Sequence, residues 1–519
     1  MNAKNLLALA ITLGLSADAG AATFVWTGTV NGNWSNTANW NPNGVPTATD
    51  RAEFSPGATW RTVATPGSGY AIDDLYFPPG ADAYSLDTSG GALNLGLGVL
   101  SESGGATRNE IRGLLALTQN GPPNRRFRAQ DGGTLDMSQA RVDIPPTGAP
   151  SSIAFMAEGG ASLILPELAI GSGGTMLSIH SSAVSPGQFF CMSGLASGSH
   201  ILSYQVRDSA KVTLGSGCSV TGFAVWWLDA ATSLVLDGGD GHKQDIVASA
   251  GSLLWVRGRP EPTTTIRYLQ MNTGSRFRFE VDAAGHATTL QTSYPSTRAS
   301  AAGTAGTPSP SPDGGSQSID GAILELDDQH PVPAWEYTLI KHGSGSYAVM
   351  GNFAGLPDGS YFRAGNGYLY DIRYHNYGDT RITTRNAGHV PFTLTRTQPA
   401  GSLQTAPEGT LVEYQLQLSN ELVVLPTVFG FDFSAQSGLA NLAWGCVSDA
   451  PCTPANGLGG HVQTTNTNPA TTTITLSGTL HRNVEAVRID GTFQVLGVNY
   501  PLHLEDPIDP NLLFKDGFD

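Results

Sequence analysis

Short strand-like runs, each preceded by glycine or another small residue, recur through the middle of this chain; examples are 90–95, 132–137, 161–165 and 210–214. One apolar marker per run gives eight intervals with a mean of 23 residues, and the markers are Leu93, Leu115, Leu135, Leu163, Phe189, Val212, Leu234, Leu253 and Phe277. A period of about 20–30 residues with strands separated by glycine is typical of a β-solenoid. We therefore predict an all-β fold with a right-handed parallel β-helix, or β-solenoid, over residues 22–386.

The physical reason for this prediction is that a single coil buries too little apolar area to be stable alone. Stacked coils pair their strands into parallel sheets and share one continuous interior. Glycine suits the corners, where φ can be positive. The alternative is an antiparallel sandwich with a hairpin every 8–12 residues or so.

Composition limits the class of protein. Of 519 residues, 64 are Gly and 32 are Pro, and only 13% are charged, which argues against a helical protein. The net charge of −16 argues against nucleic-acid binding, because the chain repels phosphate overall. An apolar content of 40% is enough to bury a core, which argues against general disorder.

The N-terminus has the features of an export signal. Lys4 provides a positive charge, residues 6–15 are apolar, and Ala19-Gly20-Ala21 offers a cleavage site. We expect a signal peptide over residues 1–21. No later segment is apolar enough to form a transmembrane helix, so the mature chain should have none. The chain should cross the inner membrane and be secreted or stay at the cell surface.

Four cysteines remain, and export makes disulfides chemically reasonable. They allow three pairings. Cys446 and Cys452 are close enough in sequence to clip a loop, and Cys191 and Cys218 are separated by about one coil. We predict these two pairs; metal ligation is the alternative, without a supporting Cys-x-x-Cys motif or nearby histidine pair.

Two changes of composition suggest boundaries. Residues 300–318 are rich in Ala, Gly, Ser, Thr and Pro, as expected for a flexible insertion. From Pro391, apolar and polar residues alternate, which suits half-buried antiparallel strands. We expect a small β-sandwich over 390–500 and a C-terminal tail over 501–519.

The start of the mature chain combines a Trp-x-Gly strand at 26–28, Asn-Trp steps at 33–34 and 39–40, and Asp-x-Ala-x-Phe at 50–54. This opening resembles exported bacterial proteins that carry the autotransporter-associated β-strand repeat. An open solenoid end exposes apolar interior and sheet edge, so it needs a cap. We expect Trp26, Trp34 and Trp40 to form this aromatic cap; stacking on a ligand is the alternative.

Residues 337–340, 351–359, 370–374 and 379–383 resemble the closing strands of the same family, so the resemblance covers about 24–386 and implies a passenger-like solenoid. It does not extend to the translocating barrel of autotransporters, so self-secretion is not implied. The 390–500 segment, with its Trp444, Cys446 and Cys452 loop, resembles an Ig-like bacterial surface repeat of unknown function. The final residues resemble the Phe-x-Asp-Gly-Phe tails of exported proteins of Gram-negative bacteria.

Few residues suggest chemistry. Asp237, Asp240 and Asp245 alternate with glycine in a segment that could wrap Ca²⁺, although Asp-Gly is also ordinary turn sequence. The Asp327-Asp328 pair with His330 gives a similar and weaker signal. Residues 124–128 form the one basic cluster, which could touch an acidic glycan or lie in a solvated loop. No catalytic motif and no cofactor other than this candidate Ca²⁺ is indicated.

The sequence thus favours an exported, non-enzymatic protein of adhesin-like or surface-structural type. Its partner is unknown; a surface glycan or another cell surface is the candidate, and no nucleic acid is expected. The alternative is a carbohydrate-active β-helix enzyme, a polysaccharide lyase or hydrolase, with a site assembled across coils.

Overall fold

A computed structural model describes residues 21–118, 124–145, 152–170, 176–182, 184–191, 196–218, 220–238, 244–293, 317–342, 349–375, 381–424, 427–481 and 484–508. The predicted signal peptide lies outside these residues except for Ala21. The predicted insertion also lies outside them except for Gln317 and Ser318, which form a short strand rather than a loop. The end of the predicted tail, from residue 509 onward, is likewise not described.

The predicted all-β fold class is confirmed: a parallel β-solenoid is followed by the antiparallel sheets of a β-sandwich. The chain divides into two compact units. The first contains the described residues up to Leu254 together with Thr265–Met271, and the second contains Trp255–Thr264 and the described residues from Asn272 onward.

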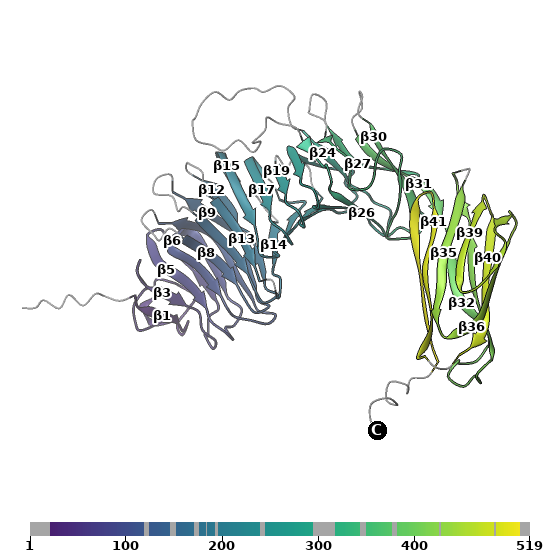
Figure 1. Cartoon of the computed structure of the whole chain (residues 1–519). Helices are drawn as coiled ribbons and strands as arrows, with labels where there is room; N and C mark the ends of the chain where they lie inside the picture. The colour runs from purple at the N-terminus through teal and green to yellow at the C-terminus, as the bar shows by residue number, and fades with distance from the viewer. Residues whose placement is uncertain are drawn as a thin grey trace, which may run out of the picture. The chain divides into compact units, whose positions relative to one another are not determined.

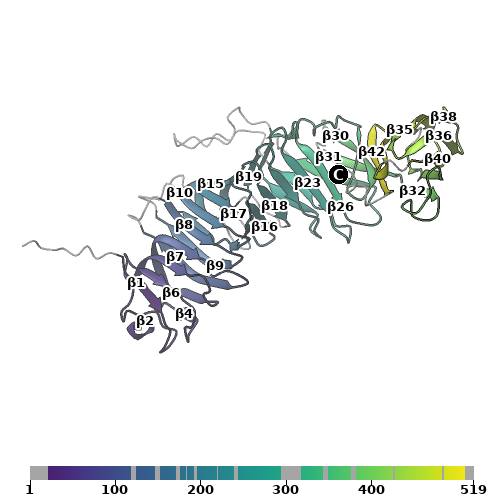
Figure 2. The ribbon, with the colours of Figure 1, turned by 60° about the horizontal axis from the view of Figure 1, so that its bottom comes forward.

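The first unit is a stack of parallel strands (Figures 1 and 2). Its elements are β1 (Thr23–Trp26), η1 (Thr37–Asn39), β2 (Trp40–Asn41), β3 (Arg51–Glu53), β4 (Thr62–Ala64), β5 (Tyr70–Phe77), β6 (Ser85–Ser101), β7 (Arg108–Leu117), β8 (Asn124–Ala129), β9 (Thr134–Ile144), β10 (Ser152–Ala157), β11 (Ser162–Ile164), β12 (Glu167–Ile170), β13 (Met176–Ser181), β14 (Gln188–Cys191), β15 (Ala196–Val206), β16 (Lys211–Gly215), β17 (Val220–Leu228), β18 (Ser233–Asp237), β19 (Gln244–Ala248) and β22 (Tyr268–Met271).

The register of this stack follows the apolar markers of the sequence. Leu135, Leu163, Phe189, Val212 and Leu234 are consecutive partners in β9, β11, β14, β16 and β18. All five side chains are fully buried. Because one column of apolar side chains passes from coil to coil, the interior is continuous, as stacking requires. The parallel pairing excludes the antiparallel sandwich considered for this region.

The three N-terminal tryptophans are buried together. Trp40 lies between Trp26 and Trp34, with ring centroids 4.9 and 4.8 Å away in edge-on geometry. Each of the three is at most 3% exposed, and Phe54 packs against all of them. The indole N–H of Trp40 donates to the carbonyl of Trp34 at 2.8 Å. Their burial agrees with the expectation from sequence, while their role as a cap stays a prediction.

The predicted disulfide between Cys191 and Cys218 is present. Cys191 ends β14, and Cys218 follows β16, the strand paired with β14 in the next coil. The bond therefore joins adjacent coils, as its sequence spacing indicated.

In the second unit the parallel stack ends in an antiparallel sheet. Its solenoid strands are β20 (Leu253–Val256), β21 (Thr263–Ile266), β23 (Arg276–Val281), β24 (Thr289–Thr292), β25 (Gln317–Ser318), β26 (Ile323–Asp328), β27 (Glu336–His342), β28 (Val349–Met350), β29 (Tyr361–Arg363), β30 (Tyr368–His375) and β31 (Arg381–His389); β20 and β21 contribute residues to both units. Strand β24 pairs with β27 in parallel, but β27–β31–β30–β29 are all antiparallel. We call these last four strands the closing sheet.

Two five-stranded antiparallel sheets form the sandwich (Figure 1). One has the order β32–β33–β40–β36–β38 and the other β37–β39–β35–β41–β42. The strands are β32 (Phe392–Gln398), β33 (Leu411–Ser419), β35 (Val428–Ser437), β36 (Leu439–Ser448), β37 (Cys452–Thr453), β38 (Asn456–Leu458), β39 (His461–Thr467), β40 (Thr471–Leu480), β41 (Ala486–Val495) and β42 (Val498–Pro507), while the short β34 (Glu421–Leu422) pairs with β31.

The sandwich core differs in extent from the segment predicted. Strand β42 continues past residue 500, and Ile508 is fully buried. Leu369 and Ala387 of the closing sheet also belong to this core. The second predicted disulfide, Cys446–Cys452, is present and joins β36 in one sheet to β37 in the other.

Helices contribute almost nothing to the described part of the chain, and none there has the length and apolar character needed to cross a membrane.

Candidate functional site

The structure describes two of the three aspartates proposed for Ca²⁺. Asp237 ends β18, Asp240 lies outside the described residues, and Asp245 is fully buried in β19. The Asp245 carboxylate pairs with Arg267, whose Nε lies 2.6 Å from Oδ1. Burial, only partly offset by Arg267, raises the pKa of Asp245. Among the described residues no group of three His, Cys, Asp or Glu side chains could hold a metal ion. The calcium site at Asp237, Asp240 and Asp245 stays a prediction.

The basic cluster at residues 124–128 does not form one patch. Arg125 is 1% exposed, and it donates to the carbonyl oxygen of Thr118. Arg128 lies on the surface, where it pairs with Glu158 of the next coil. Alternation along β8 therefore distributes these arginines between interior and surface.

Basic side chains instead gather on the outward side of the closing sheet. Its strand register aligns three rows across β27, β31 and β30. The rows are Glu336–Arg385–Asp371, Thr338–Thr383–Arg373 and Lys341–Arg381–His375. We call the surface formed by Lys341, Arg373, His375, Arg381 and Arg385 the basic face.

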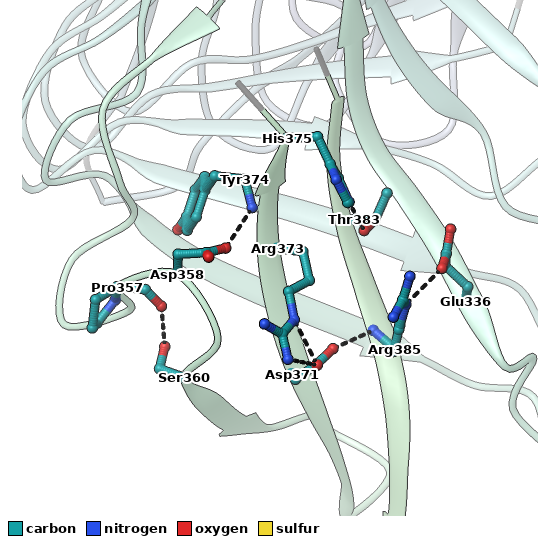
Figure 3. A network of polar contacts seen from close by, with 10 residues as sticks. All are labelled: Glu336, Pro357, Asp358, Ser360, Asp371, Arg373, Tyr374, His375, Thr383 and Arg385. Atoms are coloured by element: carbon teal, nitrogen blue, oxygen red, sulfur yellow. Dashed lines mark hydrogen bonds and ion pairs between the residues drawn. The ribbon is translucent and has the colours of Figure 1, made fainter. Parts of the chain in front are cut away.

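At one end of this face the charges neutralise each other (Figure 3). Asp371 pairs with Arg373 at 2.9 Å and accepts the backbone N–H of Arg385 at 3.2 Å. The Arg385 guanidinium reaches across to Glu336 at 2.8 Å. Asp371 has only 10% of its side chain exposed, whereas Arg373 and Arg385 have 38% and 44%. The carboxylates of Asp371 and Glu336 are therefore less exposed than the guanidinium groups of Arg373 and Arg385, which face solvent.

The other end of the face brings three basic side chains into one row. Lys341 and His375 are both register partners of Arg381 on the central strand. Like charges placed directly opposite each other destabilise a sheet. Within the described residues Lys341 forms no ion pair, and His375 contacts the Thr383 hydroxyl at 3.2 Å (Figure 3). An anion bound over this row would be attracted by both Lys341 and Arg381.

The loop between β28 and β29 holds β30 in place. Asp358 accepts the backbone N–H of Tyr374 at 2.9 Å (Figure 3). The Tyr374 hydroxyl donates to the carbonyl of Leu356. Burial raises the pKa of Tyr374 to about 12. Gly359 has φ +77°, and a Cβ there would lie 3.1 Å from Arg373 Nη1. Glycine at this position thus leaves room for the Arg373 side chain.

A second polar cluster lies on outward positions of β20, β23 and β26. The guanidinium carbons of Arg257 and Arg278 lie 4.8 and 5.2 Å from the Trp255 ring centroid. Such stacking of guanidinium on indole is a favourable cation–π geometry. Arg278 also pairs with Glu325 at 3.0 Å.

The Asp327-Asp328 pair singled out in the sequence is split between two faces of β26. Asp327 is the register partner of Glu280 in this second cluster. Burial raises the pKa of Glu280, and the negative charge of Asp327 adds to the effect. Asp328 is 2% exposed and accepts the hydroxyls of Tyr370 and Tyr337 at 2.6 and 3.0 Å. Its role is therefore internal.

Sequence reasoning missed the basic face, although it noted residues 370–374 and 379–383 as family-like strands. The available signal was the alternation of Asp371, Arg373 and His375, and of Arg381 and Arg385. Their alignment with Lys341 depends on strand pairing, which a linear motif does not contain.

No family model and no curated protein matches this chain. Among solved structures it is similar to the crystal structure of the enzymatically active domain of bacteriophage CBA120 tailspike protein 4, with 10% sequence identity. The match covers 81% of this chain and 62% of that chain, with a TM-score of 0.17. This similarity is too low to transfer a site or a substrate.

Proposed function

We propose that this chain is an exported protein of adhesin-like or surface-structural type, whose basic face binds the anionic groups of a surface polysaccharide. The disulfides suit an oxidising, extracellular environment. The observation that carries the proposal is the Lys341–Arg381–His375 row, because it gathers basic groups on a chain with a net charge of −16. Concentrated basic groups attract acidic polymers, and the attraction weakens as salt rises.

Binding of polygalacturonate to purified residues 22–519, with uncharged dextran as the comparison polymer, tests this proposal. We expect salt-sensitive binding of polygalacturonate that weakens about tenfold in the double variant Lys341→Gln/Arg381→Gln. Arg488→Gln is the matched control, because Arg488 is an exposed cation of the sandwich, paired with Glu505. Absent binding, or equal binding by the double variant, would contradict the proposal.

The second candidate function is a polysaccharide lyase or hydrolase. Glu280 favours it, since a carboxyl group whose pKa is raised beside a second carboxylate is suited to acid–base chemistry. Release of reducing ends or unsaturated products from a polysaccharide panel would detect such activity. Its loss in Glu280→Gln would assign the second cluster, and its loss in Asp237→Ala/Asp240→Ala would assign the turn after β18. Either result would replace the non-enzymatic proposal.

A further inference from the structure

A groove of about 410 Å³ crosses one face of the sandwich. It is lined from β32 by Phe392 and Thr393 with the preceding Pro391, from β33 by Gln417, Leu418 and Ser419, and from β40 by Thr471, Thr472 and Thr473. Its volume lies within the range of about 300–1,000 Å³ that is usual for ligand sites. None of these lining residues carries a charge.

The outward side chains of the groove form rows of hydroxyl and amide groups. Thr393, Gln417 and Thr473 are aligned across the three strands, and Thr395, Gln415 and Thr475 form the next row. The alternate residues, such as Leu416, Leu418 and Ile474, point into the sandwich core. Alternation along each strand therefore separates an apolar inner side from an outer side that carries hydroxyls and amides in these two rows, with the Glu413 carboxylate in the row beyond them.

The glutamine amides on this face are held in fixed positions. Gln417 Nε2 donates to Gln415 Oε1 at 3.1 Å, and Gln415 Nε2 donates to Glu413 Oε1 at the same distance. This series of side-chain hydrogen bonds leaves the Gln417 side-chain carbonyl oxygen and its second N–H available to a ligand. The hydroxyls of Thr393 and Thr473 form no hydrogen bond with any other group in the described part of the chain. Donors and acceptors are thus presented side by side.

The groove lies across β32, β33 and β40; β33 and β40 are hydrogen-bonded to a strand on each side, and β32 is the edge strand of the sheet. The groove offers no cation for an acidic ligand and no carboxylate for a basic one. The polar side-chain groups that line the groove are hydroxyls and amides. A neutral, polyhydroxylated chain matches this set of donors and acceptors.

We propose that this groove is a binding site for an uncharged oligosaccharide, separate from the basic face. The sugar hydroxyls would exchange hydrogen bonds with Thr393, Gln417 and Thr473, and the Pro391 ring would cover apolar carbons of the sugar.

Calorimetric titration of residues 22–519 with three neutral hexasaccharides, of β-1,4-linked glucose, α-1,4-linked glucose and mannose, tests this proposal. At least one should bind, and the double variant Gln417→Met/Thr473→Val should bind it at least about tenfold more weakly. Both substitutions keep side-chain size while removing hydrogen-bonding groups. Thr395→Val, in the row outside the groove, is the matched control and should bind as the unchanged protein does.

Three outcomes would overturn the proposal: no binding of any hexasaccharide, equal binding by the double variant, or an equal loss in Thr395→Val. Unchanged thermal unfolding of the double variant would show that a loss of binding does not come from misfolding. Polygalacturonate binding should survive the double variant, and hexasaccharide binding should survive Lys341→Gln, so the two sites can fail independently.

Discussion

Outward side chains are arranged differently on the solenoid and on the grooved sheet of the sandwich. On the solenoid, Arg51 pairs with Asp74 at 2.8 Å, and Arg128 pairs with Glu158, residues one coil apart in each case. The groove of the sandwich instead presents Thr393, Gln417 and related residues without charge.

The difference shows what parallel stacking demands of a surface. Because each outward residue lies beside its equivalent in the next coil, two like charges would repel along the whole stack, and alternating signs remove that repulsion. Charges paired in this way are largely satisfied by the protein itself. We therefore look for ligand sites where basic side chains are gathered, at the basic face, or where charged side chains are absent from the lining, in the groove.

The largest effect should come from the end of the solenoid. Trp34 is fully buried between Trp40 and Phe54, so Trp34→Ala should destabilise the first coils by about 4 kcal/mol. The loss can spread through neighbouring coils and expose an edge that promotes association. Thermal unfolding and light scattering measure both effects, and hydrogen exchange should show an unchanged sandwich.

Trp60→Ala is the control for this experiment, because Trp60 is 49% exposed at the same end of the chain. If Trp34→Ala melts like the unchanged protein but loses glycan binding, the tryptophans form a ligand platform and not a cap.

Each region contains one disulfide, so the contribution of a disulfide to stability can be compared between the solenoid and the sandwich. Cys191–Cys218 closes a loop of 27 residues between coils, and Cys446–Cys452 closes one of 6 residues between sheets. The chain-entropy relation gives about 3.5 kcal/mol for the longer loop and about 2 kcal/mol for the shorter. Replacing each pair by alanine and measuring unfolding in denaturant checks the order. If replacing Cys446 and Cys452 lowered the free energy of unfolding more than replacing Cys191 and Cys218, loop length would not be the deciding factor.

A third substitution tests whether the two regions are independent. Leu369 belongs to the closing sheet but is fully buried in the sandwich core. Leu369→Ala should therefore destabilise the sandwich by about 3 kcal/mol, even though the predicted boundary near 386–390 assigns it to the solenoid. Hydrogen exchange in β33 and β40 reports the change. Loss of protection confined to the closing sheet would restore the predicted boundary.

The smallest effect is a difference in pH response. Hydrogen bonds from the backbone N–H groups of Thr471 and Ala470 lower the pKa of Asp449 in the sandwich. The unfolded state then binds the proton more tightly, so stability should fall as pH drops below about 4. Burial raises the pKa of Asp245 in the solenoid. There the folded state binds the proton more tightly, so stability should fall as pH rises from about 4 through the folded-state pKa.

Hydrogen exchange measured over a pH series reports the free energy of local unfolding in each region, and so separates these two responses. Asp449→Asn should reduce the pH dependence of stability in the sandwich alone. Asp245→Asn should reduce the pH dependence of stability in the solenoid alone. Slopes of the same sign in both regions would contradict the assignment.

Much of the solenoid could be predicted from the sequence because an inward-facing apolar residue recurs in each coil. Leu163, Phe189, Val212 and Leu234 are in register as their spacing implied. The marker Leu253 is half-buried while Leu254 is fully buried, since two adjacent leucines leave the inward position ambiguous.

The candidate sites could not be predicted in the same way. The basic face brings together Lys341, His375 and Arg381 from three strands, and their alignment depends on a reversal from parallel to antiparallel pairing at β27. The groove depends on β32, β33 and β40, which are distant in sequence. Each strand taken alone shows only alternation, which does not specify its neighbours.

The pairing of β23 with β26 also has a consequence for how such a chain can be altered. Arg276 is the register partner of Ile323, although 22 or 23 residues separate partners such as Val212 and Leu234 or Phe189 and Val212. The strand register of the solenoid is thus kept whatever the length of the segment between successive coils, provided that the next strand pairs in the same place. A foreign peptide inserted between Ser293 and Gln317 should therefore leave the pairing of β23 with β26 unchanged.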